Sequence, residues 1–151
     1  MIEKFNIRVY GLLLNDKMEL LVADELEYGM EFTKFPGGGL ELGEGLIDGL
    51  VREWKEELDV KIEVLSHFYT TDFFQQSGFN PAHQLISIYY LVKNSEPFKT
   101  KFTTAAFDFT DRNAKEVLSF RWLKLEKHTH EQLTFPIDKL VVKKLFEKIS
   151  G

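Results

Sequence analysis

The sequence contains no cysteine, which excludes disulfide bonds, zinc–thiolate sites and a cysteine nucleophile. A chain without cysteine also agrees with a reducing compartment, where disulfides are rare. Positive charge is scarce: 19 Lys and Arg stand against 24 Asp and Glu, the formal net charge is −5, and no basic cluster occurs. Because a nucleic-acid polymer requires a basic surface, this balance argues against one as the main partner.

Long apolar runs are also missing. The first ten residues, MIEKFNIRVY, lack the apolar core of a signal peptide. No stretch reaches the ~18 apolar residues of a membrane span. A hydrophobic fraction of 44% and a charged fraction of 28% are ordinary for a globular chain. We therefore expect a soluble, cytoplasmic protein without a membrane partner, folded as a single domain over residues 1–151.

Hydrophobic patterning predicts strands that alternate with two helices, and hence a mixed α/β domain. The expected strands are Phe5–Leu14, Glu19–Asp24, Lys61–Thr71, Gln84–Val92 and Leu118–Leu125. The first two are expected to form a hairpin around the turn Asn15–Lys17, and the fourth, which is nearly all apolar, to be central. Residues 25–34 are predicted as a polar connection and residues 94–113 as a long loop. Residues 136–149 are predicted as the closing helix, with Pro136 in its first turn.

Residues 46–58 form the second predicted helix. Its apolar residues fall within an arc of about 140° on a helical wheel, which predicts a face packed on a sheet. These residues are Leu46, Ile47, Leu50, Val51, Trp54 and Leu58.

Three acids share another stripe of this helix. Glu53, Glu56 and Glu57 lie at i, i+3 and i+4, so their like charges destabilise the helix unless something neutralises them. A hard divalent cation such as Mg²⁺ would do so. Glu57, at the edge of the apolar arc, should be partly buried, and Gly49 on the same stripe suggests a close approach to the backbone. The alternatives are a solvated acidic face with an Arg52–Glu56 pair and a calcium-binding protein, but no EF-hand loop occurs.

A glycine-rich segment precedes the acids. Gly37, Gly38, Gly39 and Gly43 permit positive φ and close backbone approach. Glu44 follows, and a two-point Glu44–Arg52 pair would tie this predicted loop to the helix.

Loop and helix together resemble the Nudix box of the Nudix hydrolase superfamily, at residues 38–60. The matching elements are Gly38, Glu44, Arg52-Glu53, an apolar Trp54, Glu56-Glu57 and an apolar Val60. The resemblance implies the Nudix fold, an α/β/α sandwich with a central mixed β-sheet. The sequence departs from the box at Asp59, where the family usually has a glycine. Since Asp tolerates the left-handed conformation, we expect a costlier helix end and no loss of chemistry.

The resemblance also implies an activity. Nudix proteins use Mg²⁺ or Mn²⁺ to hydrolyse a diphosphate bond, commonly in a nucleoside diphosphate linked to another moiety. Carried over by position, Glu53, Glu56 and Glu57 are the expected metal ligands, with backbone of Gly38. Glu44 and Arg52 become the orienting pair, and Gly37, Gly38 and Gly39 the backbone that contacts phosphate. The general base is expected to be either a box Glu or a later one, Glu116, with Glu126 as the alternative.

Fewer residues point to the remainder of the substrate. Arg8 in the first strand is a candidate phosphate contact, and Phe73, Phe74, Phe79 and His83 are candidates for a ring pocket. An exposed strand residue and an aromatic core are the respective alternatives. A Nudix-fold sensor that binds a nucleotide or sugar without turnover is the competing function. The expected partner is a small diphosphate compound, and a homodimer is possible because many relatives are dimers.

Overall fold

The computed structural model describes all 151 residues and divides into two compact units. One consists of Met1–Leu13 and Pro36–Lys99, the other of Leu14–Phe35 and Thr100–Gly151. None of the helices has the length and apolar character needed to cross a membrane.

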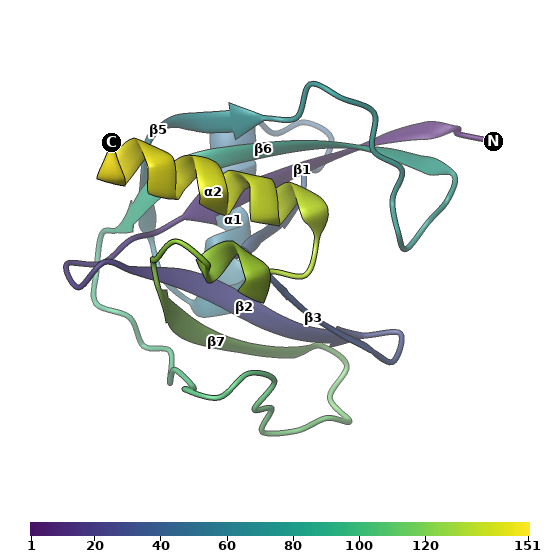
Figure 1. The fold of residues 1–151 in the computed structure, drawn as a ribbon. Coiled ribbons are helices and arrows are strands. Elements are labelled where there is room, and N and C mark those ends of the chain that lie inside the picture. Colours follow the sequence, from purple (N-terminus) through teal and green to yellow (C-terminus); the bar gives the residue numbers. More distant parts are fainter. The chain divides into compact units, whose positions relative to one another are not determined.

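The first unit is built on a mixed four-stranded sheet (Figure 1). Its elements are β1 (Lys4–Leu12), β4 (Gly37–Gly39), α1 (Leu46–Leu58), β5 (Ile62–Thr70) and β6 (His83–Asn94). The strand order is β4-β1-β6-β5, with β1 parallel to β6 and the other two pairs antiparallel. The mixed sheet predicted from the sequence is therefore present, and β6 is a central strand as expected.

The outer strand β5 pairs irregularly with β6. The register shifts between Val64 and Ser66 and again between His67 and Tyr69. At the opposite edge, β4 has only three residues. Neither edge strand of this sheet is therefore both long and regular.

The predicted hairpin between the first two strands forms only as a single antiparallel bridge between Leu14 and Leu20, and the two strands themselves do not pair. β1 pairs with β4 and β6, whereas the next strand, β2 (Glu19–Glu27), pairs within the second unit. Val9 and Leu12 of β1 are buried, as in a strand with neighbours on both sides. A continuous apolar run indicates that a strand is buried, but a local turn does not identify the strand's partner.

The glycine segment, predicted as a loop, forms strand β4. Gly37 pairs with Tyr10, Gly38 with Val9 and Gly39 with Arg8. At Gly37, φ is +150° and an added Cβ would stand 2.1 Å from the carbonyl oxygen of Val9. Only glycine fits this approach of two backbones, and so the segment can be a strand despite low strand propensity.

Helix α1 has the predicted bounds, and Leu50, Trp54 and Leu58 are buried on it. Ile47, placed on the apolar arc by the sequence, is instead 50% exposed, and it lies in the first turn of the helix. The large Trp54 fits because Gly11 faces it: a Cβ on Gly11 would lie 2.7 Å from the indole ring. The indole N–H donates to the carbonyl of Pro36 at 3.1 Å.

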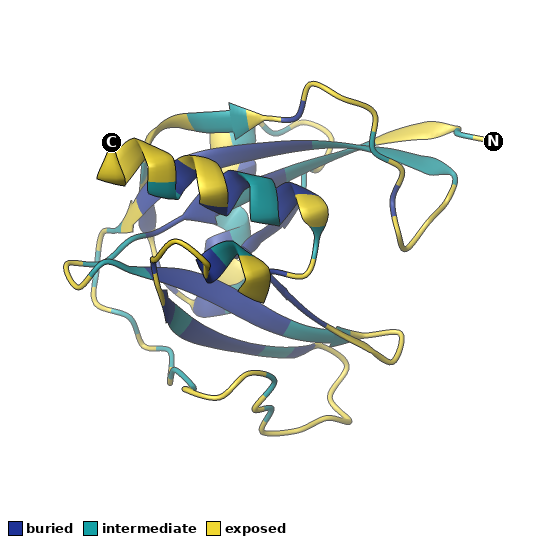
Figure 2. Ribbon diagram, viewed as in Figure 1, coloured by how far each residue is buried: buried dark blue, intermediate teal, exposed yellow.

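The second unit contains an antiparallel sheet of order β3-β2-β7. Its elements are β2, β3 (Met30–Lys34), β7 (Val117–Lys124), the 3-10 helix η1 (Thr129–Gln132) and α2 (Pro136–Ser150). β2 is buried along most of its length (Figure 2). The predicted polar connection over residues 25–34 is wrong, because β2 continues to Glu27 and turns at Tyr28–Gly29 into β3. The closing helix is confirmed, and residues 95–116 form no helix or strand.

A buried ion pair anchors that irregular segment. Asp24 is fully buried, and its carboxylate accepts from Arg121 Nε at 2.7 Å and from the Thr33 hydroxyl at 2.7 Å. Its Oδ2 also accepts from the backbone N–H of Phe107 at 3.1 Å. Phe107 has a φ of +56°, which is costly for a bulky residue. The hydrogen bond to Asp24 helps to hold it there.

Candidate active site

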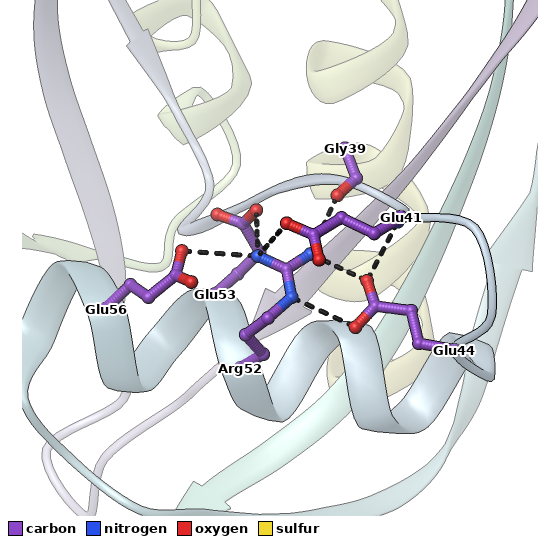
Figure 3. A network of polar contacts seen from close by, with 6 residues as sticks. All are labelled: Gly39, Glu41, Glu44, Arg52, Glu53 and Glu56. Atoms are coloured by element: carbon purple, nitrogen blue, oxygen red, sulfur yellow. Dashed lines mark hydrogen bonds and ion pairs between the residues drawn. The ribbon is translucent and has the colours of Figure 1, made fainter.

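Arg52 and Glu44 form the two-point ion pair that the sequence predicts (Figure 3). Arg52 Nε donates to Glu44 Oε2 at 3.0 Å, and Nη2 donates to Glu44 Oε1 at 2.7 Å. Nη2 also donates to the carbonyl of Gly39 at 3.0 Å. One guanidinium thus connects helix α1, the turn before it and strand β4.

Three further carboxylates lie near Nη1, the remaining nitrogen of the Arg52 guanidinium. Nη1 lies 3.0 Å from Glu53 Oε1, 3.2 Å from Glu56 Oε2 and 3.6 Å from Glu41 Oε1. The hydrogen bond from Arg52, assisted by the Glu41 backbone N–H, lowers the pKa of Glu44 to about 2. In return, the hydrogen bond to Glu44 raises the pKa of Arg52 above its usual range. This region therefore carries negative charge in excess at neutral pH.

Gly49 gives Glu44 room beside the helix. A Cβ at this position would stand 2.9 Å from Glu44 Oε1 and 2.8 Å from a methyl carbon of Leu40. The predicted close approach to the helix backbone is thus made by the Glu44 carboxylate. Any larger residue at position 49 would displace the partner of Arg52.

Glu53 lies directly against strand β4. A Cβ at Gly38 would stand 2.6 Å from the Glu53 carboxylate, whereas a Cβ at Gly39 would face Arg8 Nη1 at 3.4 Å. Neighbouring strand residues point to opposite faces of a sheet. The structure therefore places Glu53 and Arg8 on opposite faces, with Glu53 on the face covered by α1.

The acids do not form a ready-made cation cage. Glu57 is half-buried, as predicted, and its Oε1 atom is shielded from solvent. No three His, Asp or Glu side chains meet in a metal-binding arrangement. Instead, Arg52 lies between Glu53 and Glu56. The assignment of the three box acids as metal ligands stays a prediction.

A comparison with protein families identifies this arrangement. The sequence matches the model of the NUDIX domain over residues 4–145 of 151. The chain belongs to the NUDIX domain family. Membership supports, in general terms, a hydrolase whose substrate contains a nucleoside diphosphate. No curated protein matches the sequence.

Several solved structures share this fold. The solution structure of the E. coli ORF135 protein has 16% identity and a TM-score of 0.72, covering 97% of this chain and 92% of that one. The MutT protein of Methanosarcina mazei Go1 has 20% identity and a TM-score of 0.69, covering 100% and 99%. MutT from Aliivibrio salmonicida and Vibrio cholerae has 22% identity and a TM-score of 0.67, covering 95% and 98%. These likenesses confirm the predicted fold class.

Asp59 is the departure from the Nudix box, and it adopts the left-handed conformation at the end of α1. Its φ and ψ are 49° and 43°. Its carboxylate lies 2.7 Å from Lys55 Nζ and 3.5 Å from Lys99 Nζ. The Lys55 hydrogen bond is the main cause of a lowered pKa of Asp59. Asp59, which replaces the usual glycine, thus forms ion pairs with two lysines.

Arg8 and His83, two of the candidate residues for the rest of the substrate, lie apart along the sheet. Arg8 Nε donates to the Tyr10 hydroxyl at 3.0 Å. His83 pairs with Lys4, four residues from Arg8 along β1, which corresponds to about 13 Å. Phe74 is 61% exposed. Their binding roles stay predictions.

The candidate bases Glu116 and Glu126 both lie in the second unit and are exposed. Glu116 ends the irregular segment just before β7. Its role also stays a prediction.

Two residues of this site were missed by the sequence analysis. Glu41 reaches Arg52, and its backbone N–H donates to Glu44 Oε1 at 2.9 Å. Gly11 accommodates Trp54. For Glu41, a signal was available in its position three residues before Glu44, as in a turn closed by a side chain. For Gly11 no signal existed, because its neighbour is distant in sequence.

Proposed function

We propose that this chain is a divalent-metal-dependent Nudix hydrolase that cleaves the diphosphate bond of a nucleoside diphosphate linked to another moiety. The observation that carries the proposal is the acidic cluster around Arg52, held against the backbone of β4. A solved UDP-X diphosphatase shares the fold, with 14% identity and a TM-score of 0.62, which makes nucleotide-linked diphosphates suitable first substrates. We also expect a homodimer, because many Nudix relatives are dimers.

The residues fit a hard divalent cation. The donor set consists of oxygen atoms alone, as Mg²⁺ and Mn²⁺ prefer. Glu53 is cradled against Gly38, and one oxygen of Glu57 is buried. Glu56 is 57% exposed and can turn from Arg52 towards an ion. Glu53, Glu56, Glu57 and the backbone of Gly38 would hold the metal.

Such an ion would neutralise phosphate oxygens and activate water for attack on phosphorus. The chain's own residues do the positioning. Arg52 keeps Glu44 and the carbonyl of Gly39 in place through its Nε and Nη2 atoms. The backbone of Gly37–Gly39, without side chains, lets phosphate oxygens approach closely. A carboxylate accepts the proton of the attacking water, and Glu116 is our candidate.

The test is a cleavage assay with nucleoside triphosphates, nucleotide sugars, ADP-ribose and dinucleoside polyphosphates, with and without Mg²⁺. Glu56→Gln should lower metal-dependent turnover on the order of 100-fold or more, because one anionic ligand is lost. Glu147→Gln, an exposed helical acid of α2, is the matched control and should leave turnover unchanged. Tight binding of these compounds without any turnover would support the sensor instead.

Glu116→Gln separates the two possible bases. If Glu116 accepts the proton, the variant should lose about 100-fold or more in kcat while its metal affinity stays the same. A rate near that of the wild type would remove Glu116 and leave a box carboxylate or Glu126 as the base.

A further inference from the structure

The second unit contains an open groove whose lining includes none of the residues assigned to the proposed hydrolase. It lies between the β2–β3 turn and the irregular segment before β7, with a volume of about 410 Å³. Small-molecule sites typically occupy about 300–1,000 Å³. Its lining includes Glu27, Tyr28, Gly29, Arg112 and Lys115.

One wall presents a tyrosine at an unfavourable position. Tyr28 and Gly29 form a two-residue turn with φ values of 51° and 72°. Turns of this kind favour Asn-Gly, because both central residues need positive φ. A bulky residue there is an outlier, and such outliers often mark function. Tyr28 is also 85% exposed, so core packing does not explain its presence.

The other wall presents two cations. Arg112 is oriented by Glu31, whose Oε2 lies 2.9 Å from Nη2, and its guanidinium carbon stands 5.2 Å from the centre of the Phe109 ring. Lys115 is exposed and makes no hydrogen bond or ion pair within the chain. An ammonium without a partner is available to an anion from solution.

The irregular segment that carries these cations is fixed in place. The Phe107 N–H is bound to the buried Asp24, and the Thr103 N–H donates to the carbonyl of Phe120 at 2.8 Å. The Arg112–Glu31 pair fastens the segment to β3. The aromatic wall and the cationic wall are therefore held beside each other before any ligand arrives.

We propose that this groove binds a nucleoside monophosphate. The base would stack on the Tyr28 ring, since aromatic faces accept every nucleobase. The phosphate would lie at Lys115 with Arg112, because a dianion suits an ammonium and a guanidinium together. Glu27 would accept a hydrogen bond from a ribose hydroxyl or a base amino group. None of the box acids lines this groove, and its binding of a nucleotide does not depend on a divalent metal.

The test is calorimetric titration with AMP, GMP, CMP and UMP in the presence of EDTA, which prevents metal-dependent binding at the box. Tyr28→Asn should weaken binding about tenfold or more, and Lys115→Gln by about tenfold. Lys127→Gln, an exposed lysine outside the groove, should bind like the wild type. Tyr28→Asn should also unfold at a higher temperature, because Asn suits positive φ. Its loss of binding would therefore not be loss of fold.

Three results would overturn the proposal. The first is absence of mononucleotide binding by the wild-type protein. The second is equal affinity of Tyr28→Asn and the wild type, or of ribose phosphate and the mononucleotides, which would remove the stacking contact. The third is loss of binding in Glu56→Gln, which would locate the nucleotide at the box.

Discussion

The two carboxylate oxygens of Glu44 accept separate hydrogen bonds from the guanidinium of Arg52, at 3.0 Å from Nε and 2.7 Å from Nη2. This fork fixes the start of the box relative to helix α1. Because it uses Nε and Nη2, it leaves Nη1 for the acids that we propose as metal ligands. Release of Glu53 and Glu56 to a cation would not undo it.

The first prediction concerns the protonation of Glu44. Its pKa is lowered to about 2 from 4.5, chiefly by the Arg52 hydrogen bond. The stabilisation from this group is complete above the unfolded pKa and is lost as pH falls from about 4.5 towards 2. A carboxyl NMR titration should give a midpoint near 2. In Arg52→Gln the midpoint should rise towards the ordinary value; an unchanged midpoint would show that Arg52 is not the cause.

The second prediction separates strong and weak partners within the acidic cluster. Arg52→Lys loses the planar fork and should lower kcat by about 10- to 100-fold through misplacement of the box. Glu41→Gln should change kcat by less than about threefold, because Glu41 is 66% exposed and 3.6 Å from Nη1. Mn²⁺ affinity, followed by electron paramagnetic resonance, provides a second measurement. Equal effects of the two substitutions would contradict the central position of Arg52.

The third prediction concerns the fit of Gly11 to Trp54. Gly11→Ala should destabilise the fold by about 1–3 kcal/mol, because the new methyl group enters the space of a buried ring. The effect should shrink in a Trp54→Phe background, where the ring is smaller. Gly78→Ala is the control, since a Cβ at Gly78 meets nothing within 4 Å. Urea denaturation measures all of these, and strict additivity would refute the contact.

The fourth prediction concerns the buried Asp24–Arg121 pair. Arg121→Met leaves a buried carboxylate without its cation and should cost about 3–5 kcal/mol in unfolding free energy. Replacement of Asp24 by Asn in the same protein should recover part of that loss. A double variant less stable than Arg121→Met would contradict this account.

The fifth prediction concerns Asp59 at the end of α1. Asp59→Gly removes backbone strain at a φ of 49° but also the contacts with Lys55 and Lys99. Since these contacts are exposed and screened, we expect Asp59→Gly to melt slightly above the wild type. Asp59→Ala loses the contacts and keeps the strain, so it should melt below the wild type. The reverse order would show that the lysine contacts dominate.

The parts predicted well from the sequence depend on local spacing. Helix α1 and the Glu44–Arg52 pair follow from an apolar periodicity and from a motif of 23 residues. The left-handed Asp59 follows from the same motif. Such features involve neighbours along the chain, which a single sequence displays directly.

The parts that were missed depend on partners distant in sequence. Strand β3 carries two buried polar residues, Thr33 and Lys34, which contact Asp24 and Glu25. The polar residues in the sequence of this strand are explained only by those partners. Its turn, Tyr28–Gly29, also lacks the Asn-Gly or Asp-Gly pair that marks such hairpins. Strand β4 consists of glycines, and only the approach of Val9 to Gly37 and of Glu53 to Gly38 shows why glycine is required there.

The two edges of the mixed sheet bear on how the protein behaves at high concentration. A long, regular edge strand offers its backbone groups to another chain and promotes edge-to-edge aggregation. Here β4 has only three residues, and the pairing of β5 with β6 shifts register twice. Such irregularities prevent continuous pairing with an added strand. We therefore expect any self-association of this protein to use side-chain surfaces rather than extension of this sheet.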